Sequence, residues 1–169
     1  MPEPNRSGSI ESWEPRIVAF FCNWCTYTAA DQAGISRMIY PSNVMIVRLM
    51  CSGRLDPQFV LKAFREGADG VLIGGCHPGD CHYLEGNYKA LRRYKLLRRM
   101  LKQFGIEEDR LRLEWISASE GDRVQKVATE MVKKIRMLGP LHLEPVPHPA
   151  EHEEMIPEAV GAAIEGGPS

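Results

Sequence analysis

The sequence predicts an α/β domain: a doubly wound, mostly parallel four-stranded sheet with flanking helices and an extended C-terminal arm. Two observations support this fold class. Short apolar runs, typical of strands, alternate with longer stretches of helical periodicity in the order β-α-β-α-β-α-β-α. The first of these runs, RIVAFF, is continuously apolar after its Arg, as in a strand covered on both faces. Such an order favours parallel strands joined by right-handed crossovers.

Each predicted strand is a short apolar or alternating run bounded by residues that favour turns. The four predicted strands span residues 16–21, 44–50, 70–73 and 110–116. The last alternates, which places Leu111, Leu113 and Trp115 on one face.

The predicted helices carry recognisable start and stop signals, and they span residues 26–39, 57–66, 86–104 and 121–138. Asp56 is expected to cap the second helix, with Pro57 in its first turn, and Ser119 to cap the last. The inward faces are expected to consist of Phe59, Val60, Ala63 and Phe64 in the second helix, and of Tyr88, Leu91, Leu96, Leu97, Met100, Leu101 and Phe104 in the third.

Composition bounds the organisation and the location of the chain. It has 169 residues and a formal charge of -1, which fits one compact domain with tails. We expect a flexible lead (1–15), the α/β domain (16–139) and a C-terminal arm (140–169). No apolar stretch is long enough to span a membrane and the start has no hydrophobic secretory segment, so we expect a cytoplasmic protein. The arm is either disordered or, as we expect, docks on a partner through Ile156, Val160 and Ile164, which recur at helical spacing.

The most informative feature is the placement of the five cysteines. Each follows a predicted strand directly or within a few residues: Cys22, Cys25, Cys51, Cys76 and Cys81. Because ligands of open α/β sheets bind beyond the carboxyl ends of the strands, we expect these thiols to meet at one edge. Thiolates gathered in this way suit a metal ion or an iron–sulfur cluster. A disulfide framework is unfavourable in a reducing compartment and fits an odd cysteine count poorly.

Several kinds of centre fit these residues. The spacing matches neither a zinc finger nor a zinc ribbon, and loop glycines and helix-start amides favour an anionic [2Fe–2S] cluster. Five cysteines exceed its four ligands; Cys22, Cys76 and Cys81 are the firmest choices, while Cys25 and Cys51 compete for the last place. His77 and His82 are Rieske-like ligands in one interpretation and line the site in the one that we prefer. The alternatives from other classes are a dithiol oxidoreductase using Cys22 and Cys25, and a zinc-stabilised interaction module.

Other features exclude or favour particular functions. The chain has no phosphate-binding glycine motif and no acyl-transfer nucleophile motif, so no catalytic residue is predicted. Trp24 covers the centre, meets a partner, or is an aromatic residue that caps the core. The stretch from 86 to 106 holds seven Lys or Arg and no acid, while the last twenty residues hold five Glu and no Lys or Arg. We expect the basic helix to be a solvated face or to dock on an acidic partner, and we expect no nucleic-acid binding.

Three segments carry a family resemblance: FCNWCTYTAADQAGISRMIYP, VRLMCSGRLDPQFVLKAFREGADGVLIGGCHPGDCHYLEGN and RRYKLLRRML. Over residues 16–139 the chain resembles the delta subunit of methyl-viologen-reducing hydrogenase. The resemblance implies a non-catalytic electron-transfer subunit with one [2Fe–2S] cluster in a hetero-oligomeric complex. It would relay electrons from a hydrogenase or a formate dehydrogenase to the flavin of heterodisulfide reductase, for electron bifurcation in methanogens and other anaerobes. All five cysteines fall on motif positions of the family.

Overall fold

A four-stranded parallel sheet forms the centre of the protein, as the sequence predicts. The computed structural model describes residues 13–143. The strands are β1 (Ile17–Cys22), β2 (Val44–Leu49), β3 (Gly70–Gly75) and β4 (Leu111–Trp115). Their spatial order is β2-β1-β3-β4, and every neighbouring pair is parallel. The first three strands, whose ends carry the cysteines, therefore lie next to one another.

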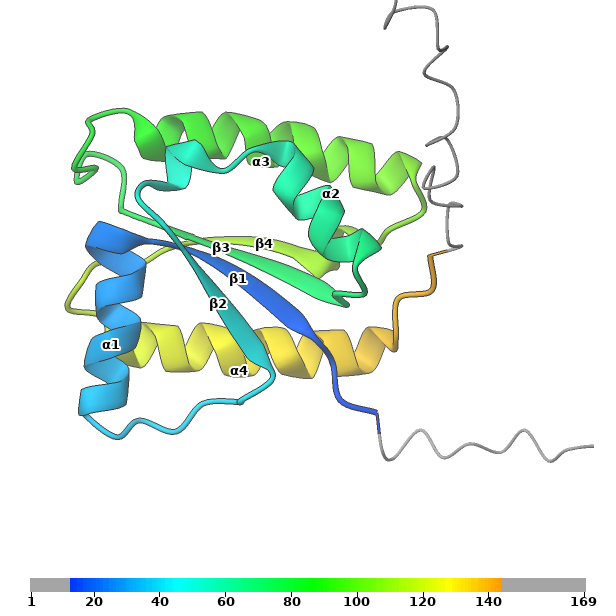
Figure 1. The fold of residues 1–169 in the computed structure, drawn as a ribbon, viewed down its shortest axis with the longest axis horizontal. Helices are drawn as coiled ribbons and strands as arrows, with labels where there is room; N and C mark the ends of the chain where they lie inside the picture. Colours follow the sequence, from blue (N-terminus) through cyan, green and yellow to red (C-terminus); the bar gives the residue numbers. More distant parts are fainter. Residues whose placement is uncertain (1–12, 144–169) are drawn as a thin grey trace, which may run out of the picture.

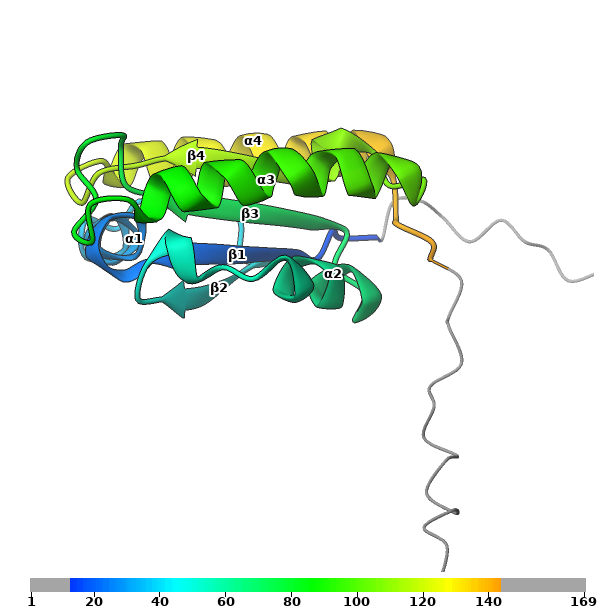
Figure 2. The same ribbon diagram turned by 90° about the horizontal axis from the view of Figure 1, so that it is seen from above.

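Two helices cover each face of the sheet (Figures 1 and 2). The helices are α1 (Thr28–Ile35), α2 (Pro57–Arg65), α3 (Gly86–Gln103) and α4 (Gly121–Leu138). Figure 1 shows α1 and α4 on one face and α2 and α3 on the other. The fold is the predicted layered α/β arrangement, and within residues 13–143 no helix is both long and apolar enough to cross a membrane.

Each face of the sheet has its own apolar core, because successive side chains of a strand point to opposite faces. In β1, Phe21 belongs to the core under α1 and α4, and Phe20 belongs to the core under α2 and α3. Met131 and Ile135 of α4 fill the first core, and the second core contains Phe64, Leu97 and Leu101.

A buried carboxylate ties both ends of the domain to the sheet. Asp69, 6% exposed at the start of β3, accepts hydrogen bonds from two backbone N–H groups. Its Oδ2 lies 2.8 Å from the Arg16 nitrogen, and its Oδ1 lies 3.0 Å from the Leu141 nitrogen. The same residue thus fixes the chain before β1 and after α4.

The first helix differs from its prediction at both ends. A π-helical turn, Asn23–Tyr27, precedes α1, and α1 ends at Ile35 instead of continuing to residue 39. The end is a Schellman motif: Met38 N–H bonds to the Ala33 carbonyl, and Arg37 N–H bonds to the Gly34 carbonyl. Arg37 has φ 54°, a conformation that stops the helix before Tyr40 and Pro41.

The predicted inward faces of α2 and α3 are only partly correct. Val60, Phe64, Leu97 and Leu101 are buried, but four residues predicted to face inward are about half exposed: Phe59, Tyr88, Leu96 and Phe104. The buried positions of α3 form a narrow stripe that includes Ala90, so the helix meets the core along one line and its flanking apolar side chains stay in solvent.

One of the two predicted helix caps is present in the structure, and the other is not. Asp56 Oδ1 accepts from Gln58 N–H at 2.9 Å, which confirms the cap of α2. The prediction for Ser119 is wrong: α4 begins at Gly121 as predicted, but the residue at its N-cap is Glu120, and the Ser119 hydroxyl bonds to the Ser117 hydroxyl instead. The C-terminal arm, including Ile156, Val160 and Ile164, lies outside the described residues.

Candidate metal centre

All five cysteines lie at the carboxyl edge of the sheet, in the loops that follow β1, β2 and β3. Cys22 ends β1, Cys25 lies in the π-helical turn, and Cys51 follows β2. Cys76 follows β3, and Cys81 lies five residues before α3. The strand order β2-β1-β3 brings these loops together, at the left of Figure 1.

The sulfur atoms lie in two close groups. Cys22 and Cys76 have Sγ atoms 3.7 Å apart, and with Cys25 they form a set whose Sγ atoms all lie within 4.8 Å of one another. Cys51 and Cys81 form the second group, with Sγ atoms 4.0 Å apart. All five residues are buried free thiols. The expectation that thiols far apart in sequence meet at one edge is confirmed.

Glycines leave room for the second sulfur pair. A Cβ on Gly86 would lie 2.1 Å from the Cys51 sulfur, closer than real Cβ contacts, and 3.0 Å from the Cys81 sulfur. A Cβ on Gly53 would meet the backbone of Gly86 at 2.8 Å. The backbone itself is therefore packed against sulfur here, and no larger residue fits at Gly86.

Backbone amides point at the sulfur atoms from the helical turns that follow the strands. Gly53 N–H donates to the Cys51 sulfur at 3.3 Å. Burial of Cys81 opposes its ionisation, but N–H groups of Tyr83, Asn87 and Gly86 outweigh this effect and lower the pKa of Cys81. Such amides stabilise a negatively charged sulfur centre, as expected for loops that begin helices.

The three thiols of the first sulfur group shift one another's pKa. Thiol donation from Cys25, then from Cys76, lowers the pKa of Cys22 to about 2, against the effect of burial. Donation to Cys22 is the main cause that raises the pKa of Cys25 to about 11, and it raises that of Cys76 as well. Thiolates this close repel one another in a buried site, so all of them ionise together only around a cation.

One buried hydroxyl beside the sulfur atoms has no protein partner. The Ser52 side chain is 1% exposed, and its Oγ has no hydrogen-bond partner among residues 13–143. It lies against Gly75, where an added Cβ would be 3.0 Å from it, and the Ser52 N–H donates to Cys22. Because buried polar atoms are nearly always satisfied, this orphan donor fits a ligand at the sulfur site.

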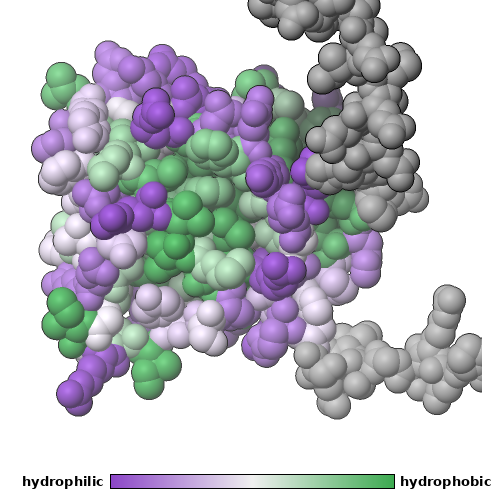
Figure 3. Space-filling model, in the orientation of Figure 1, coloured by the Kyte–Doolittle hydropathy of each residue, from purple (hydrophilic) through white to green (hydrophobic). Residues whose placement is uncertain are grey.

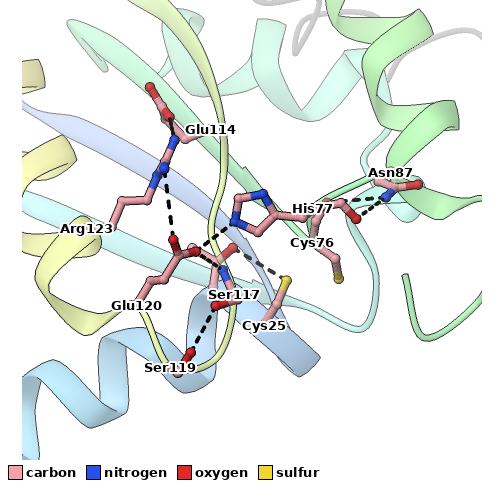
Figure 4. A network of polar contacts seen from close by, with 10 residues as sticks. Cys25, Cys76, His77, Asn87, Glu114, Ser117, Ser119, Glu120 and Arg123 are labelled. Atoms are coloured by element: carbon pink, nitrogen blue, oxygen red, sulfur yellow. Dashed lines mark hydrogen bonds and ion pairs between the residues drawn. The ribbon is translucent and has the colours of Figure 1, made fainter. Parts of the chain in front are cut away.

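A polar network holds the loop after β3 in place (Figure 4). His77 Nε2 lies 2.7 Å from Glu120 Oε2, and the same oxygen accepts from Ser117 N–H at 2.6 Å. The Ser117 N–H, then the His77 ring, lowers the pKa of Glu120 to about 2. On the other side of the loop, Asn87 donates to the carbonyls of Cys76 and His77. The network links the loop to the starts of α3 and α4.

An aromatic stack joins the two cysteine motifs at the surface. Trp24 and His82 stack with ring centroids 3.9 Å apart, and Trp24 Nε1 donates to the Tyr83 hydroxyl at 3.4 Å. Both predicted histidines therefore have other contacts: His77 pairs with Glu120, and His82 covers Trp24. Trp24 is 44% exposed, so one side of its ring covers His82 and the rest of it meets solvent.

Sequence reasoning located the cysteines but missed the residues that shape their surroundings: Gly53, Gly86, Ser52, Asn87 and Glu120. Gly86 had a signal, because glycine is an unfavourable residue in a helix and here stands at the start of one. Ser52, Asn87 and Glu120 have none, since a single Ser, Asn or Glu near a motif is usually a surface residue.

Comparison with known proteins identifies relatives of this site. Residues 17–139 match the family described as methyl-viologen-reducing hydrogenase, delta subunit (FlpD). The chain is 58% identical over 134 residues to the vhc iron-sulfur subunit of the F420-non-reducing hydrogenase of Methanococcus voltae, covering 79% of this chain and 93% of the relative. It is 59% identical over 134 residues to the F420-non-reducing hydrogenase iron-sulfur subunit of Archaeoglobus profundus, covering 79% of this chain and 98% of the relative.

A longer relative contains the same domain. The chain is 48% identical over 130 residues to one subunit of the ferredoxin:CoB-CoM heterodisulfide reductase of Methanosarcina mazei, a match that covers 77% of this chain but only 16% of the relative. The region that matches the family holds all five cysteines, and the relatives that the match covers almost completely are named iron-sulfur subunits. The fold, the gathered thiols and these matches agree: the chain belongs to the methyl-viologen-reducing hydrogenase delta subunit family.

Proposed function

We propose that this protein is an electron-transfer subunit that carries one [2Fe–2S] cluster inside a larger oxidoreductase complex. The observation that carries the proposal is the meeting of two sulfur groups, 3.7 Å and 4.0 Å across their closest pairs, from three loops at one sheet edge. The surroundings fit such a cluster on three counts: a glycine backbone against sulfur, amides that donate to sulfur, and an unpaired buried hydroxyl among the residues that the structure describes.

Two close sulfur pairs supply the four ligands of such a cluster. We assign Cys22 and Cys76 as one pair and Cys51 and Cys81 as the other. Cys25 is then the spare thiol, because it belongs to the close group but to neither of the two closest sulfur pairs. This assignment keeps the three cysteines that the sequence favours and prefers Cys51 over Cys25.

When bound, the cluster supplies reversible storage of a single electron. The chain's own residues set the conditions for that storage. The amides of Gly53, Gly86 and Asn87 stabilise negative charge on sulfur, and the buried thiols exclude water from it. No group positioned for proton transfer to a substrate is required, which agrees with a carrier rather than a catalyst.

The relatives support the choice of partners. Relatives named as hydrogenase iron-sulfur subunits are separate chains, whereas the same domain forms part of a longer heterodisulfide reductase chain in Methanosarcina mazei. We propose that this subunit takes electrons from a hydrogenase, or from a formate dehydrogenase, and passes them to the flavin of heterodisulfide reductase for bifurcation. The C-terminal arm is proposed to dock on a neighbouring subunit.

One observation favours a second function, dithiol oxidoreductase. The lowered pKa of Cys22 beside the raised pKa of Cys25 is the pattern of a nucleophilic thiol and its partner. Cys22 is only 1% exposed, however, so a substrate disulfide cannot reach it without opening of the site. Because the Cys22 thiol is inaccessible, electron transfer is the favoured function.

Single Cys→Ser variants of the anaerobically purified protein test the proposal. We expect the iron content to fall sharply in the variants at Cys22, Cys51, Cys76 and Cys81, and to persist in Cys25→Ser. Electron paramagnetic resonance after reduction identifies the cluster type. A variant series in which only Cys22→Ser and Cys25→Ser change any property, with insulin-reducing activity lost and no chromophore, would favour the dithiol function.

A further inference from the structure

A continuous hollowed surface runs from Cys51 to the outer side of α2. It consists of three adjoining hollows of about 350, 360 and 380 Å³. The first is lined by Cys51 and Tyr83 and shares Met50 and Arg54 with the second. The second shares Phe59 with the third, which reaches Lys62. We call this surface the β2–α2 groove.

The charge along the β2–α2 groove is strongly one-sided. Among the described residues, only one acidic side chain lines it, Asp56, and that carboxylate is engaged in capping α2. The cationic side chains that line it are Arg48, Arg54, Lys62, Arg65, Lys89 and Arg93. Arg54 and Lys62 are exposed and have no ion pair among residues 13–143. Arg65 and Lys89 pair with Glu66 and Glu85, and the Arg48 guanidinium lies over the Tyr27 ring. A surface with this balance attracts an acidic partner.

The centre of the same face is apolar. β2 and α2 lie nearest the viewer in Figure 1, and Figure 3 shows hydrophobic residues gathered there with hydrophilic ones around them. Met50 is 56% exposed, Phe59 47% and Tyr83 51%. An apolar centre with a charged rim is the arrangement found in protein–protein interfaces.

The position of the groove links it to the sulfur site. Cys51, a proposed cluster ligand, lines the hollow at one end, beside Gly86. A protein seated in the groove would therefore press against the backbone that encloses the Cys51 and Cys81 sulfurs. Electron transfer needs such a close approach, whereas a docking surface on the outer side of α4 would be separated from the sulfurs by a helix layer.

We propose that the β2–α2 groove docks an acidic, apolar-centred surface of the flavin subunit of heterodisulfide reductase, with its contact centred on Met50 and Arg54. The inference rests on the proposed function, and it adds which face of this chain meets the partner. The cationic rim accelerates encounter with the acidic surface, and the apolar centre slows dissociation.

The test compares two charge-reversed proteins of equal net charge. One carries Arg54→Glu and Lys62→Glu in the groove, and the matched control carries Lys126→Glu and Lys133→Glu on the exposed side of α4. Association of each full-length, cluster-loaded protein with the purified flavin subunit is measured anaerobically at low and high ionic strength. We expect an association rate about tenfold lower for the groove variant and weaker salt dependence, with less than about a twofold change in the control.

A second variant tests the apolar centre without changing charge. Phe59→Ser, at a position that is about half exposed, is expected to raise the dissociation rate and leave the association rate nearly unchanged. Equal effects of the groove and control variants would overturn the proposal, and so would a wild-type protein that does not bind the flavin subunit. Self-association that the groove variant abolishes would overturn it as well, by assigning the groove to a second copy.

Iron and sulfide analysis of the same samples separates the two proposals. If the cluster-loaded groove variant associates with the flavin subunit as wild type does, the docking surface is overturned and the proposed function is left intact. A wild-type protein without a cluster overturns the proposed function, and its binding data still report on the surface.

Discussion

Gly86 lies directly against the sulfur of Cys51, so close that a Cβ at this position would sit 2.1 Å from Sγ. The glycine opens α3, where a side chain would ordinarily be harmless, and its packing against sulfur explains why none is present. Because Gly86 has no side chain, the start of α3 packs directly against the loop after β2, and the Cys51 and Cys81 sulfurs stay close together.

Gly86→Ala is expected to abolish cluster binding or reduce it severely, because the new methyl displaces Cys51 or Cys81. The matched control is Gly34→Ala in α1, where an added Cβ meets nothing within 4 Å. Iron and acid-labile sulfide per chain, together with the visible spectrum, provide the measurement. Full cluster content in Gly86→Ala would contradict this, because it would show that the loop carrying Cys51 moves aside without any loss of cluster binding.

Ser52→Ala is expected to lower the reduction potential of the cluster, since hydrogen bonds to cluster sulfur stabilise the reduced, more negative state. The Ser52 hydroxyl is buried and has no partner among the described residues, so the cluster is its natural acceptor. A redox titration followed by electron paramagnetic resonance measures the shift, with the exposed Ser36→Ala as control. An unchanged midpoint would mean that the hydroxyl points away from the cluster.

Asp69→Ala is expected to destabilise the domain by about 3 kcal/mol, because it leaves two backbone donors in a partly buried place without their charged acceptor. Denaturant unfolding provides the value. Asp109→Ala, which removes an exposed ion pair with Lys134, is the control and should cost less than about 1 kcal/mol. If both variants unfold at the same denaturant concentration, Asp69 does not secure the ends of the domain.

Glu120 is expected to make stability depend on acidity. Its pKa is lowered to about 2 in the folded protein, first by the Ser117 N–H and then by His77. A carboxylate with a lowered folded pKa stabilises the fold above its unfolded pKa, near 4.5. That contribution is lost as the pH falls from about 4.5 towards about 2.

Unfolding of wild type and Glu120→Gln at several pH values measures this contribution. We expect Glu120→Gln to be less stable than wild type at about pH 6 and the difference to shrink on acidification through that range. Glu66→Gln, at an exposed helix end, is the control. A difference that stays constant from about pH 6 to about pH 3 would contradict the account.

The sequence predicts the sheet well because its strands are strong apolar runs. β1 and β2 begin within one residue of their predicted positions, and α4 matches its predicted range. β3 runs two residues further than predicted, through Gly74 and Gly75. These glycines give no strand signal; in three dimensions, they provide space for Thr26 and Trp115.

The candidate site is predictable to the level of its loops but not of its contacts. Parallel topology alone places Cys22, Cys51 and Cys76 at one edge, because their strands are neighbours. Which sulfurs pair depends on the π-helical turn and on the tight approach of Gly86, and neither follows from local sequence. The exposed Phe59 was expected in the core for a related reason: periodicity shows that a helix has an apolar face but does not show how wide its contact is.

The most direct test of the central claim is the iron, sulfide and zinc content of the anaerobically purified wild-type protein. If sulfurs from three loops hold one [2Fe–2S] cluster, the protein contains about two iron and two sulfide per chain and almost no zinc. A colourless protein with about one zinc per chain and no sulfide would contradict the account, because the same thiols would then hold a structural ion that carries no electrons.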